Sequence, residues 1–439
     1  MNDVRPIRGL MYDPRRVSMA DVSAPPYDII TPRMQDALYN RSPYNIVRVD
    51  FGRQEPDDVP GGIAGGIAGG IAGSIAGSIA GSVEGGDKYV RAAAYMRQWI
   101  KEDVLKFWPR PAFYLYEAVY TVNTGSQSLR KTMRGVFAAV GLVELGRGVF
   151  PHEKTRSKPK EDRLNLMHAC MANTSPVFSI YDDPRGQADG IFDRHAARPP
   201  YYEFSDAEGI DHRLWVIDGQ ADVDLISREI GGCDIFIADG HHRYETALTF
   251  QEQMKDRGIP GCGYVLMYLV NSARNDMTIF ATHRLLRSLP VDKDPLGALE
   301  NHFGVERIDA PNGLSDSIVG RSHCFGLYLG TTRESYVLQW NGKGLDDIDP
   351  ALRGVDVEIL HELILQKLYN VEDLEFEMNA ARAVEKVDAG EFKAAILLNP
   401  TSVADVERAA RMGHRLPPKS TYFYPKIPTG LVINRFEGL

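Results

Sequence analysis

The stretch that most constrains the fold is residues 234–248, because it passes within a few positions from an apolar run to a turn and then to a helical pattern. Residues 235–238 predict a short buried strand, and Asp239-Gly240 predicts the tight turn that ends it. The next residues open a helix, whose first backbone N–H groups have no partner within the helix and lie at its positive end. A strand, a glycine turn and a helix start in this order favour anion binding. Three further donors stand at this start: His241, His242 and Arg243.

The length and the net charge of the chain limit the classes of function that we expect. A chain of 439 residues can hold two or three domains and a sizeable core. It has 50 basic and 59 acidic residues and a formal net charge of −9, so nothing draws it as a whole to nucleic acid or to an anionic membrane. We therefore expect a small-molecule partner, with no nucleic acid and no membrane.

The cysteines and the N-terminus predict the compartment. Four cysteines lie far apart without C-x-x-C spacing, which indicates buried free thiols in a reducing environment. The first residues lack the apolar core of a signal peptide. Both features predict a cytoplasmic protein.

Residues 61–83 repeat Gly-Gly-Ile-Ala and later Gly-Ser-Ile-Ala, with a glycine at every fourth position. This spacing occurs in membrane helix dimers. Each glycine costs about 1 kcal/mol in a helix relative to alanine, and the repeat has no aromatic belt or basic flank. We expect a low-complexity insertion loop over residues 61–86 that carries no chemistry, with a membrane span as the less favoured alternative.

The remaining pattern mixes helices and strands and predicts an α+β fold. We expect residues 1–60 to form the N-terminal segment of a catalytic domain, residues 87–290 its core, and residues 291–439 a C-terminal α+β region. Strands are expected at 46–49, 112–117, 119–122, 134–140, 177–181, 213–217, 263–270, 277–284, 324–329, 335–339 and 393–401, and helices at 87–103, 161–172, 241–257, 355–369 and 403–412.

A basic loop precedes the helix expected at 161. Proline and charge predict a loop over residues 149–160, in which basic side chains would neutralise phosphates and Glu153 would accept a proton from a hydroxyl. A solvated charged loop is the alternative. The basic residues are Lys154, Arg156, Lys158, Lys160 and Arg163, beside His152 and Glu153.

Other segments carry weaker signals. Two prolines make residues 24–28 rigid, so Tyr27 and Asp28 either line a site or belong to a plain turn. Arg48, inside an expected strand, either pairs with a carboxylate or points at a ligand. His283 and Arg284 end an expected strand and suit a site better than a core. Residues 419–426 could fold back as a strand whose polar ends reach the same cleft.

Several separated motifs occur together in this chain. They are Ala-Pro-Pro-Tyr-Asp at 24–28, Pro-His-Glu-Lys-Thr at 151–155, Ala-Asp-Gly-His-His-Arg-Tyr-Glu-Thr-Ala at 238–247, Thr-His-Arg at 282–284, Leu-Asn-Pro-Thr at 398–401 and Lys-Ser-Thr-Tyr-Phe at 419–423. With them the chain resembles the family catalogued as domain-of-unknown-function 1015, over nearly its whole length except the glycine repeat.

A second resemblance concerns function. The residues from Gly240 to Ala247 look like the Gly-x-x-Arg-x-x-x-Ala box of the ParB and sulfiredoxin superfamily, which implies a ParB/sulfiredoxin-like nucleotide-binding core. Free serine kinases carry an Asp-Gly-His-His-Arg box much like this one, which implies phosphoryl transfer from ATP or ADP to a small hydroxyl compound such as serine. Sulfiredoxin's catalytic cysteine is replaced here by His241 and His242, which argues against sulfinic acid reduction. ParB-type DNA binding would need a helix-turn-helix and a basic surface, and neither is clear.

The resemblance and the residues together give each candidate a role. We expect the turn to hold the nucleotide phosphates and Asp239 to hold Mg²⁺. A non-catalytic nucleotide-binding regulator and a phosphatase or hydrolase of a phosphorylated metabolite use the same residues and stay open, as does the oligomeric state. The expected catalytic residues are Glu153, His152, His242 and Asp239; the nucleotide ligands Asp239, Gly240, His241, His242, Arg243, Lys154 and Arg156; and the acceptor ligands Arg48, His283 and Arg284.

Overall fold

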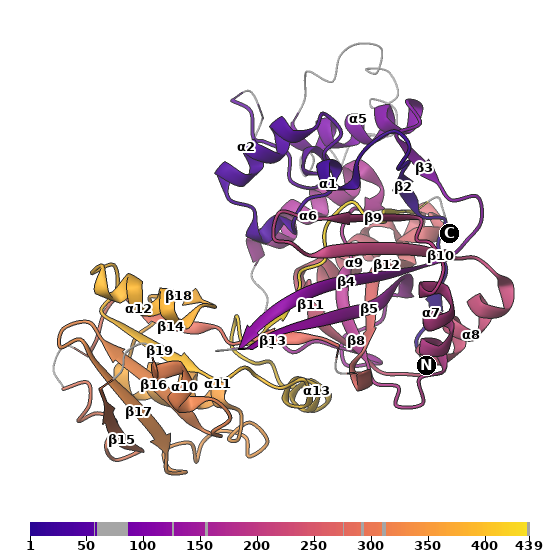
Figure 1. The fold of residues 1–439 in the computed structure, drawn as a ribbon. Helices are drawn as coiled ribbons and strands as arrows, with labels where there is room; N and C mark the ends of the chain where they lie inside the picture. The colour runs from indigo at the N-terminus through magenta and orange to yellow at the C-terminus, as the bar shows by residue number, and fades with distance from the viewer. Residues whose placement is uncertain are drawn as a thin grey trace.

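The computed structural model describes residues 1–56, 58, 87–124, 127–153, 157–274, 276–290, 294–309 and 313–436. The described elements form a large and a small sheet unit with helices packed on both (Figure 1). The mixed α+β class expected from the sequence is confirmed. The glycine repeat and the basic residues Lys154 and Arg156 lie outside the described residues.

The large sheet has nine strands in the described part of the chain, in the order β6-β11-β8-β12-β5-β4-β10-β9, with β1 beside β5. Most neighbours are antiparallel, whereas β11–β6 and β12–β8 are parallel. Its strands are β1 (Val4–Arg5), β4 (Phe113–Thr124), β5 (Gln127–Gly141), β6 (Val149–Phe150), β8 (Val177–Tyr181), β9 (Tyr202–Ser205), β10 (Asp211–Ile217), β11 (Ile235–Asp239) and β12 (Tyr264–Asn271).

Both faces of this sheet are buried. In β5, Val136 and Ala138 belong to one core cluster and Phe137 and Ala139 to the other, as the two-residue period of a strand requires. The apolar run of β12 fits a central strand, as predicted. On one face pack α7 (Gln187–Ala196), α8 (Gln220–Gly231) and α9 (His241–Met254); on the other pack α1 (Met19–Val22), α2 (Pro32–Arg41), α3 (Val47–Asp50) and α5 (Lys88–Lys101), while α6 (Ser157–Cys170) contributes to both clusters.

The small sheet is antiparallel throughout, in the order β15-β17-β16-β19-β14-β18. The helices α10 (Leu314–Ile318) and α12 (Ala380–Asp388) cover one face, and α11 (Asp356–Glu358) with the π-helix η6 (Ile359–Tyr369) covers the other. Its strands are β14 (His283–Leu286), β15 (Phe303–Ile308), β16 (Cys324–Leu329), β17 (Glu334–Trp340), β18 (Leu374–Glu377) and β19 (Ala394–Leu398).

After β19 the chain returns to the large unit. The helix α13 (Val403–Arg411) follows, then β20 (Tyr422–Tyr424) pairs with β13 (Thr278–Phe280), and β21 (Asn434–Arg435) pairs with β7 (Ala172–Asn173). A further pair, β2 (Leu10–Tyr12) with β3 (Leu105–Phe107), lies near the N-terminus. The strands of the small sheet thus run from 283 to 398, and the residues after them rejoin the large unit; the division at 290 and 291 stays a prediction.

Two expected strands are wrong. Residues 46–49 lie in and before the helix α3, because the Asn45 side chain accepts the Val47 N–H (3.0 Å) and the Asp50 N–H bonds to the Ile46 carbonyl (2.8 Å). Residues 277–284 break at 281–282 into β13 and β14, so His283 and Arg284 begin a strand instead of ending one.

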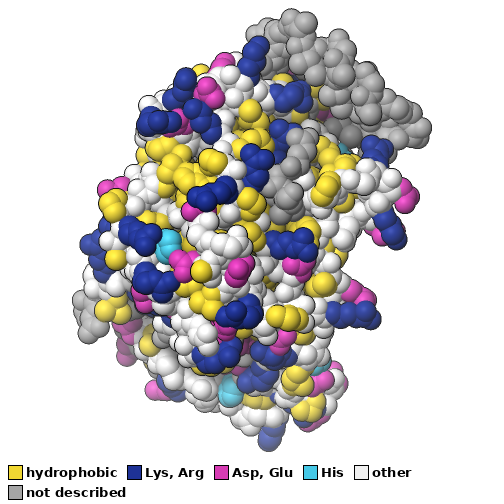
Figure 2. Space-filling view, turned by 90° about the vertical axis from the view of Figure 1, so that its right-hand side faces the viewer, with side chains coloured by type: hydrophobic (Ala, Val, Ile, Leu, Met, Phe, Trp, Pro, Cys, Tyr) yellow, Lys and Arg dark blue, Asp and Glu magenta, His cyan; other side chains and the backbone are white. Residues whose placement is uncertain are grey.

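The structure also bears on the expectations about the cysteines and about a membrane span. All four cysteines are free thiols, and three of them, Cys170, Cys262 and Cys324, are buried, as predicted. Among the described residues no helix combines the length and apolarity needed to cross a membrane. On the face shown in Figure 2, basic and acidic side chains are interspersed.

Candidate functional site

The turn between β11 and α9 has the predicted geometry. Gly240 has a φ of +94°, a left-handed conformation that glycine adopts without strain. A Cβ at this position would lie 2.7 Å from Arg243 Nε, so a side chain here would displace the Arg243 guanidinium. Gly240 provides no side-chain cap, and the first turn of α9 has no acidic residue. The start of α9 therefore keeps its capacity to bind an anion.

Asp239 lies directly before this turn, between two cations. Its Oδ2 is 3.0 Å from Lys426 Nζ and 3.6 Å from Arg243 Nη2. Burial opposes ionisation of Asp239, but Lys426 and Arg243 outweigh burial, and the pKa of the carboxyl lies well below its usual value. Asp239 is thus an anion whose charge is already shared by two side chains.

His152 and His241 are buried and face each other, with ring centroids 4.7 Å apart. The His152 ring donates from Nδ1 to the Ile237 carbonyl (2.8 Å) and lies 3.0 Å from Thr421 Oγ1 through Nε2. The His152 N–H donates to His241 Nε2 (3.2 Å). Burial lowers the pKa of His152 to about 4 and also lowers the pKa of His241, which favours the neutral form of both rings. These contacts fit a structural role, and catalysis by His152 stays a prediction.

His242 and Arg243 differ in their contacts. Arg243 folds back over the turn, donates to the Pro176 carbonyl, and has a side chain only 11% exposed. His242 is half-buried, and burial lowers its pKa, with Asp28 and Lys419 among the charges that act on it. Both side chains are therefore partly accessible at the turn, and Asp28 lies close to His242.

Glu153 approaches the same turn from the loop after β6. Its Oε1 accepts the N–H of Lys419 (3.2 Å), and its carbonyl accepts from Arg415 Nη1 (3.1 Å). Burial raises the pKa of Glu153; the Lys419 N–H opposes this shift, and the charge of Asp239 adds to it. The site thus contains one carboxyl whose pKa is lowered, Asp239, and one whose pKa is raised, Glu153. In enzymes such a difference lets one carboxyl act as an acid or base while the other stays ionised.

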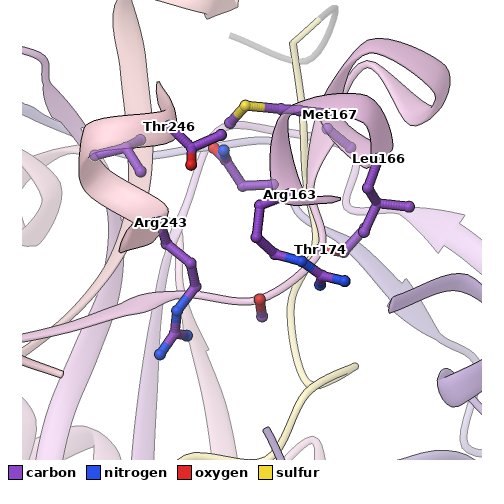
Figure 3. Close-up of a pocket in the computed structure, with 10 residues that line it drawn as sticks. Arg163, Leu166, Met167, Thr174, Arg243 and Thr246 are labelled. Atoms are coloured by element: carbon purple, nitrogen blue, oxygen red, sulfur yellow. The ribbon is translucent and has the colours of Figure 1, made fainter. Parts of the chain in front are cut away.

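A pocket opens beside the turn, between α6 and α9 (Figure 3). Arg163 and Arg243 both line it. Arg163 stacks over the Tyr27 ring at 4.1 Å and pairs with Asp162 at 2.6 Å, which brings the rigid segment 24–28 to the site. The remaining lining residues are Leu166, Met167, Ala172, Asn173, Thr174, Ser175, Thr246 and Val265.

Of the residues expected to bind an acceptor, one is near the site. Arg284 is buried over Phe376, and burial lowers its pKa to about 10 against the opposing charge of Glu153. His283 is buried in β14 and accepts the Leu398 N–H (3.4 Å). Arg48 donates to the Tyr39 carbonyl (2.8 Å) and stacks on that ring, on the side of α2 and α5. These contacts of His283 and Arg48 lie away from the turn, and the roles expected for the two residues stay predictions.

Three charged residues near the turn have no role in the sequence-based assignment: Lys419, Lys426 and Arg163. The two lysines flank an aromatic stretch that is predicted to fold back as a strand with its polar ends at the cleft, and the structure has β20 there. In the sequence, Arg163 is one of five basic residues in a charged run. No local pattern indicates which of these side chains meets Asp239 or Tyr27, because the partners lie far away in the sequence.

Fold and site together define a mixed α+β protein with an uncapped helix start surrounded by cations. The chain belongs to the family described as protein of unknown function (DUF1015), whose model matches residues 4–62 and 77–358. No curated protein matches it.

Solved structures give distant similarities. A free serine kinase mutant in complex with AMP is 14% identical, with 68% of this chain and 92% of that chain covered and a TM-score of 0.34. A conserved hypothetical protein from Pyrococcus furiosus is 14% identical, with 69% and 96% covered and a TM-score of 0.33. SbnI from Staphylococcus aureus, truncated at its C-terminus, is 11% identical, with 67% and 86% covered and a TM-score of 0.33. At these values the similarities assign no function to this chain.

Proposed function

We propose that this protein transfers a phosphoryl group from a nucleotide, ATP or ADP, to the hydroxyl of a small metabolite, with free serine as the first acceptor to test. One observation carries the proposal: an uncapped helix start after Gly240 lies beside a cation-paired Asp239 and a second carboxylate, Glu153, whose pKa is raised. Phosphoryl transfer needs positioning and charge neutralisation more than covalent chemistry, and this site offers both.

Each residue has a defined task in this proposal. The backbone N–H groups at the start of α9 bind nucleotide phosphates, with His242 beside them. Asp239 holds Lys426 and Arg243 in place near the transferring group. Glu153 accepts the proton of the acceptor hydroxyl, since a raised pKa brings a carboxylate closer to the value that suits a general base.

Magnesium does not fit at Asp239 as a resident ion. Two cationic side chains already lie within 4 Å of its carboxylate. Lys426 and Arg243 supply the positive charge in the proposed mechanism, and no step passes through a metal ion.

The test is a coupled assay with ATP or ADP as donor and free serine among a panel of small hydroxyl compounds. Glu153→Gln removes the base, and we expect kcat to fall by roughly 10²- to 10⁴-fold while nucleotide affinity is kept. Glu144→Gln, at a glutamate whose side chain is 72% exposed, is the matched control and keeps full activity. Asp239→Asn is expected to lose turnover as well, because Lys426 and Arg243 lose their anchor.

The same assay, run over a range of pH, tests the direction in which the rate changes. Glu153 acts as a base only when deprotonated, and its pKa is raised, so the rate falls as pH drops through that raised value. This acid limb is absent from the residual rate of Glu153→Gln. Full activity in both variants contradicts the proposal. Nucleotide binding without acceptor-dependent turnover indicates a regulator, and turnover with water alone indicates a hydrolase.

A further inference from the structure

Lys419 has an unusual backbone. Its φ is +59°, in the left-handed region that non-glycine residues rarely adopt because Cβ crowds the backbone. Conformations of this kind persist where the surrounding structure enforces them, and they cluster at functional sites. Lys419 is also exposed, so burial of an apolar side chain does not explain the strain.

Contacts on both sides of Lys419 enforce this conformation. Its N–H donates to Glu153 Oε1 (3.2 Å), and its carbonyl accepts from Thr282 Oγ1 (2.7 Å). The carbonyl of Ser420 accepts from Thr401 Oγ1 (3.0 Å). Thr282 and Thr401 are buried and stand at the two connections between the sheet units, before β14 and after β19. The small unit thus helps to fix the segment that bears Lys419.

The side chain of Lys419 differs from that of the neighbouring lysine. Lys426 is ion-paired with Asp239, and its side chain is only 13% exposed. Lys419 makes no ion pair within the described residues, yet its charge acts on the pKa of Glu153, of Asp239 and of His242. It is therefore a cation at the mouth of the site that is not committed to an internal partner.

We propose that Lys419 binds the terminal phosphoryl group of the nucleotide, and that its left-handed backbone, fixed by Glu153 and Thr282, places the amine beside the base. The inference rests on the proposed function. The transferring group must lie between the donor and the hydroxyl that Glu153 deprotonates, so a lysine anchored to Glu153 is next to that group. The ligand class is a terminal phosphate dianion, as at the end of ADP, ATP or pyrophosphate.

Lys419→Gly tests this with little disturbance of the fold, because glycine adopts the same φ without strain. Arg333→Gly is the matched control: Arg333 also has a positive φ (+56°), is exposed, and lies in the hairpin between β16 and β17. Both variants lose one positive charge and relieve one strained residue. Titration calorimetry with AMP, ADP, ATP and inorganic pyrophosphate, together with Tm, gives the readout.

We expect Lys419→Gly to keep its Tm and to bind ADP, ATP and pyrophosphate roughly tenfold to a hundredfold more weakly, with AMP changed little. Lys419→Arg should recover most of the affinity, and Arg333→Gly should match the wild type. Unchanged ADP affinity in Lys419→Gly overturns the inference and leaves the proposed function standing. Binding of pyrophosphate that depends on Lys419 without any nucleotide binding supports the lysine site and overturns the nucleotide donor. A wild type that binds none of the four ligands overturns both.

Discussion

Each of the two sheet units has a carboxylate at a strand end that is held by one lysine and one arginine. In the large unit, Asp239 lies 3.0 Å from Lys426 and 3.6 Å from Arg243. In the small unit, Glu377 ends β18 and lies 2.9 Å from Lys386 and 3.6 Å from Arg382. In both cases burial opposes ionisation while the lysine favours it, and the pKa of the carboxyl is lowered.

The helix that follows distinguishes the two. Glu377 Oε1 accepts the N–H of Met378 (3.0 Å) and of Asn379 (3.2 Å), and the Asn379 side chain accepts the Arg382 N–H (3.0 Å). The start of α12 is thus capped by its own sequence. The start of α9 follows Gly240, which has no side chain to cap it. Similar charges therefore form a closed structural site in one unit and a site open to an anion in the other.

Removal of each carboxylate gives the largest contrast. Asp239→Asn leaves Lys426 and Arg243, with side chains 13% and 11% exposed, without a counter-ion, and we expect a loss of about 3 kcal/mol in the free energy of unfolding. Glu377→Gln should cost less, about 1 kcal/mol, because Arg382 is 67% exposed and Lys386 is 23% exposed, so both are better solvated than Lys426 and Arg243. Urea denaturation of both variants measures the difference, and equal losses would contradict it.

Measurements at acid pH test whether loss of the Asp239 ion pairs explains the lower stability of Asp239→Asn. A carboxyl whose pKa is lowered in the folded protein contributes stability above its unfolded pKa, and that contribution is lost as pH falls toward the folded value. The difference in unfolding free energy between the wild type and Asp239→Asn should therefore be full near neutral pH and shrink below about pH 4. A difference that does not change with pH would assign the loss to packing.

Two glycines with left-handed backbones give the second contrast. Gly240→Ala introduces a Cβ at a φ of +94° and displaces Arg243, so we expect a loss of about 2 kcal/mol together with loss of nucleotide binding. Gly342, after β17, has a φ of +85° and open space around it, so Gly342→Ala should cost about 1–2 kcal/mol and leave nucleotide binding intact. Thermal unfolding and calorimetry with ADP separate the two outcomes. Retained binding in Gly240→Ala would remove the turn from the phosphate site.

The open turn could be predicted because its signals are local. An apolar run, a glycine and a polar helix start occupy consecutive positions at 235–243, and the structure has β11, a left-handed Gly240 and α9 in that order. The mixed α+β class followed from the same kind of signal. The strand expected at 46–49 was wrong because β-branched residues outweighed Asn45, whose side chain bonds start the helix.

The partners of the turn could not be predicted, because tertiary packing brings them together. Lys426 meets Asp239 across 187 residues, and the Lys419 N–H meets Glu153 across 266. Charge alone gave no guidance either. Arg48 was an expected acceptor ligand, and Arg163 was one basic residue of a charged run. Of these two arginines, Arg163 lines the pocket beside the turn and Arg48 does not.

The smallest contrast concerns the cap itself. Asn379→Ala removes the side chain that accepts the Arg382 N–H at the start of α12, and we expect a loss of about 1 kcal/mol in the free energy of unfolding, the usual effect of losing an N-cap. Glu377 still accepts two backbone N–H groups there, so the uncapped start should gain no measurable phosphate or ADP binding. Denaturation and calorimetry on this variant test whether an open helix start needs more than a missing cap to bind an anion. ADP binding at α12 after the substitution would show that a missing cap beside Lys386 and Arg382 is enough to bind an anion, and the particular cations around Gly240 would then lose their proposed importance.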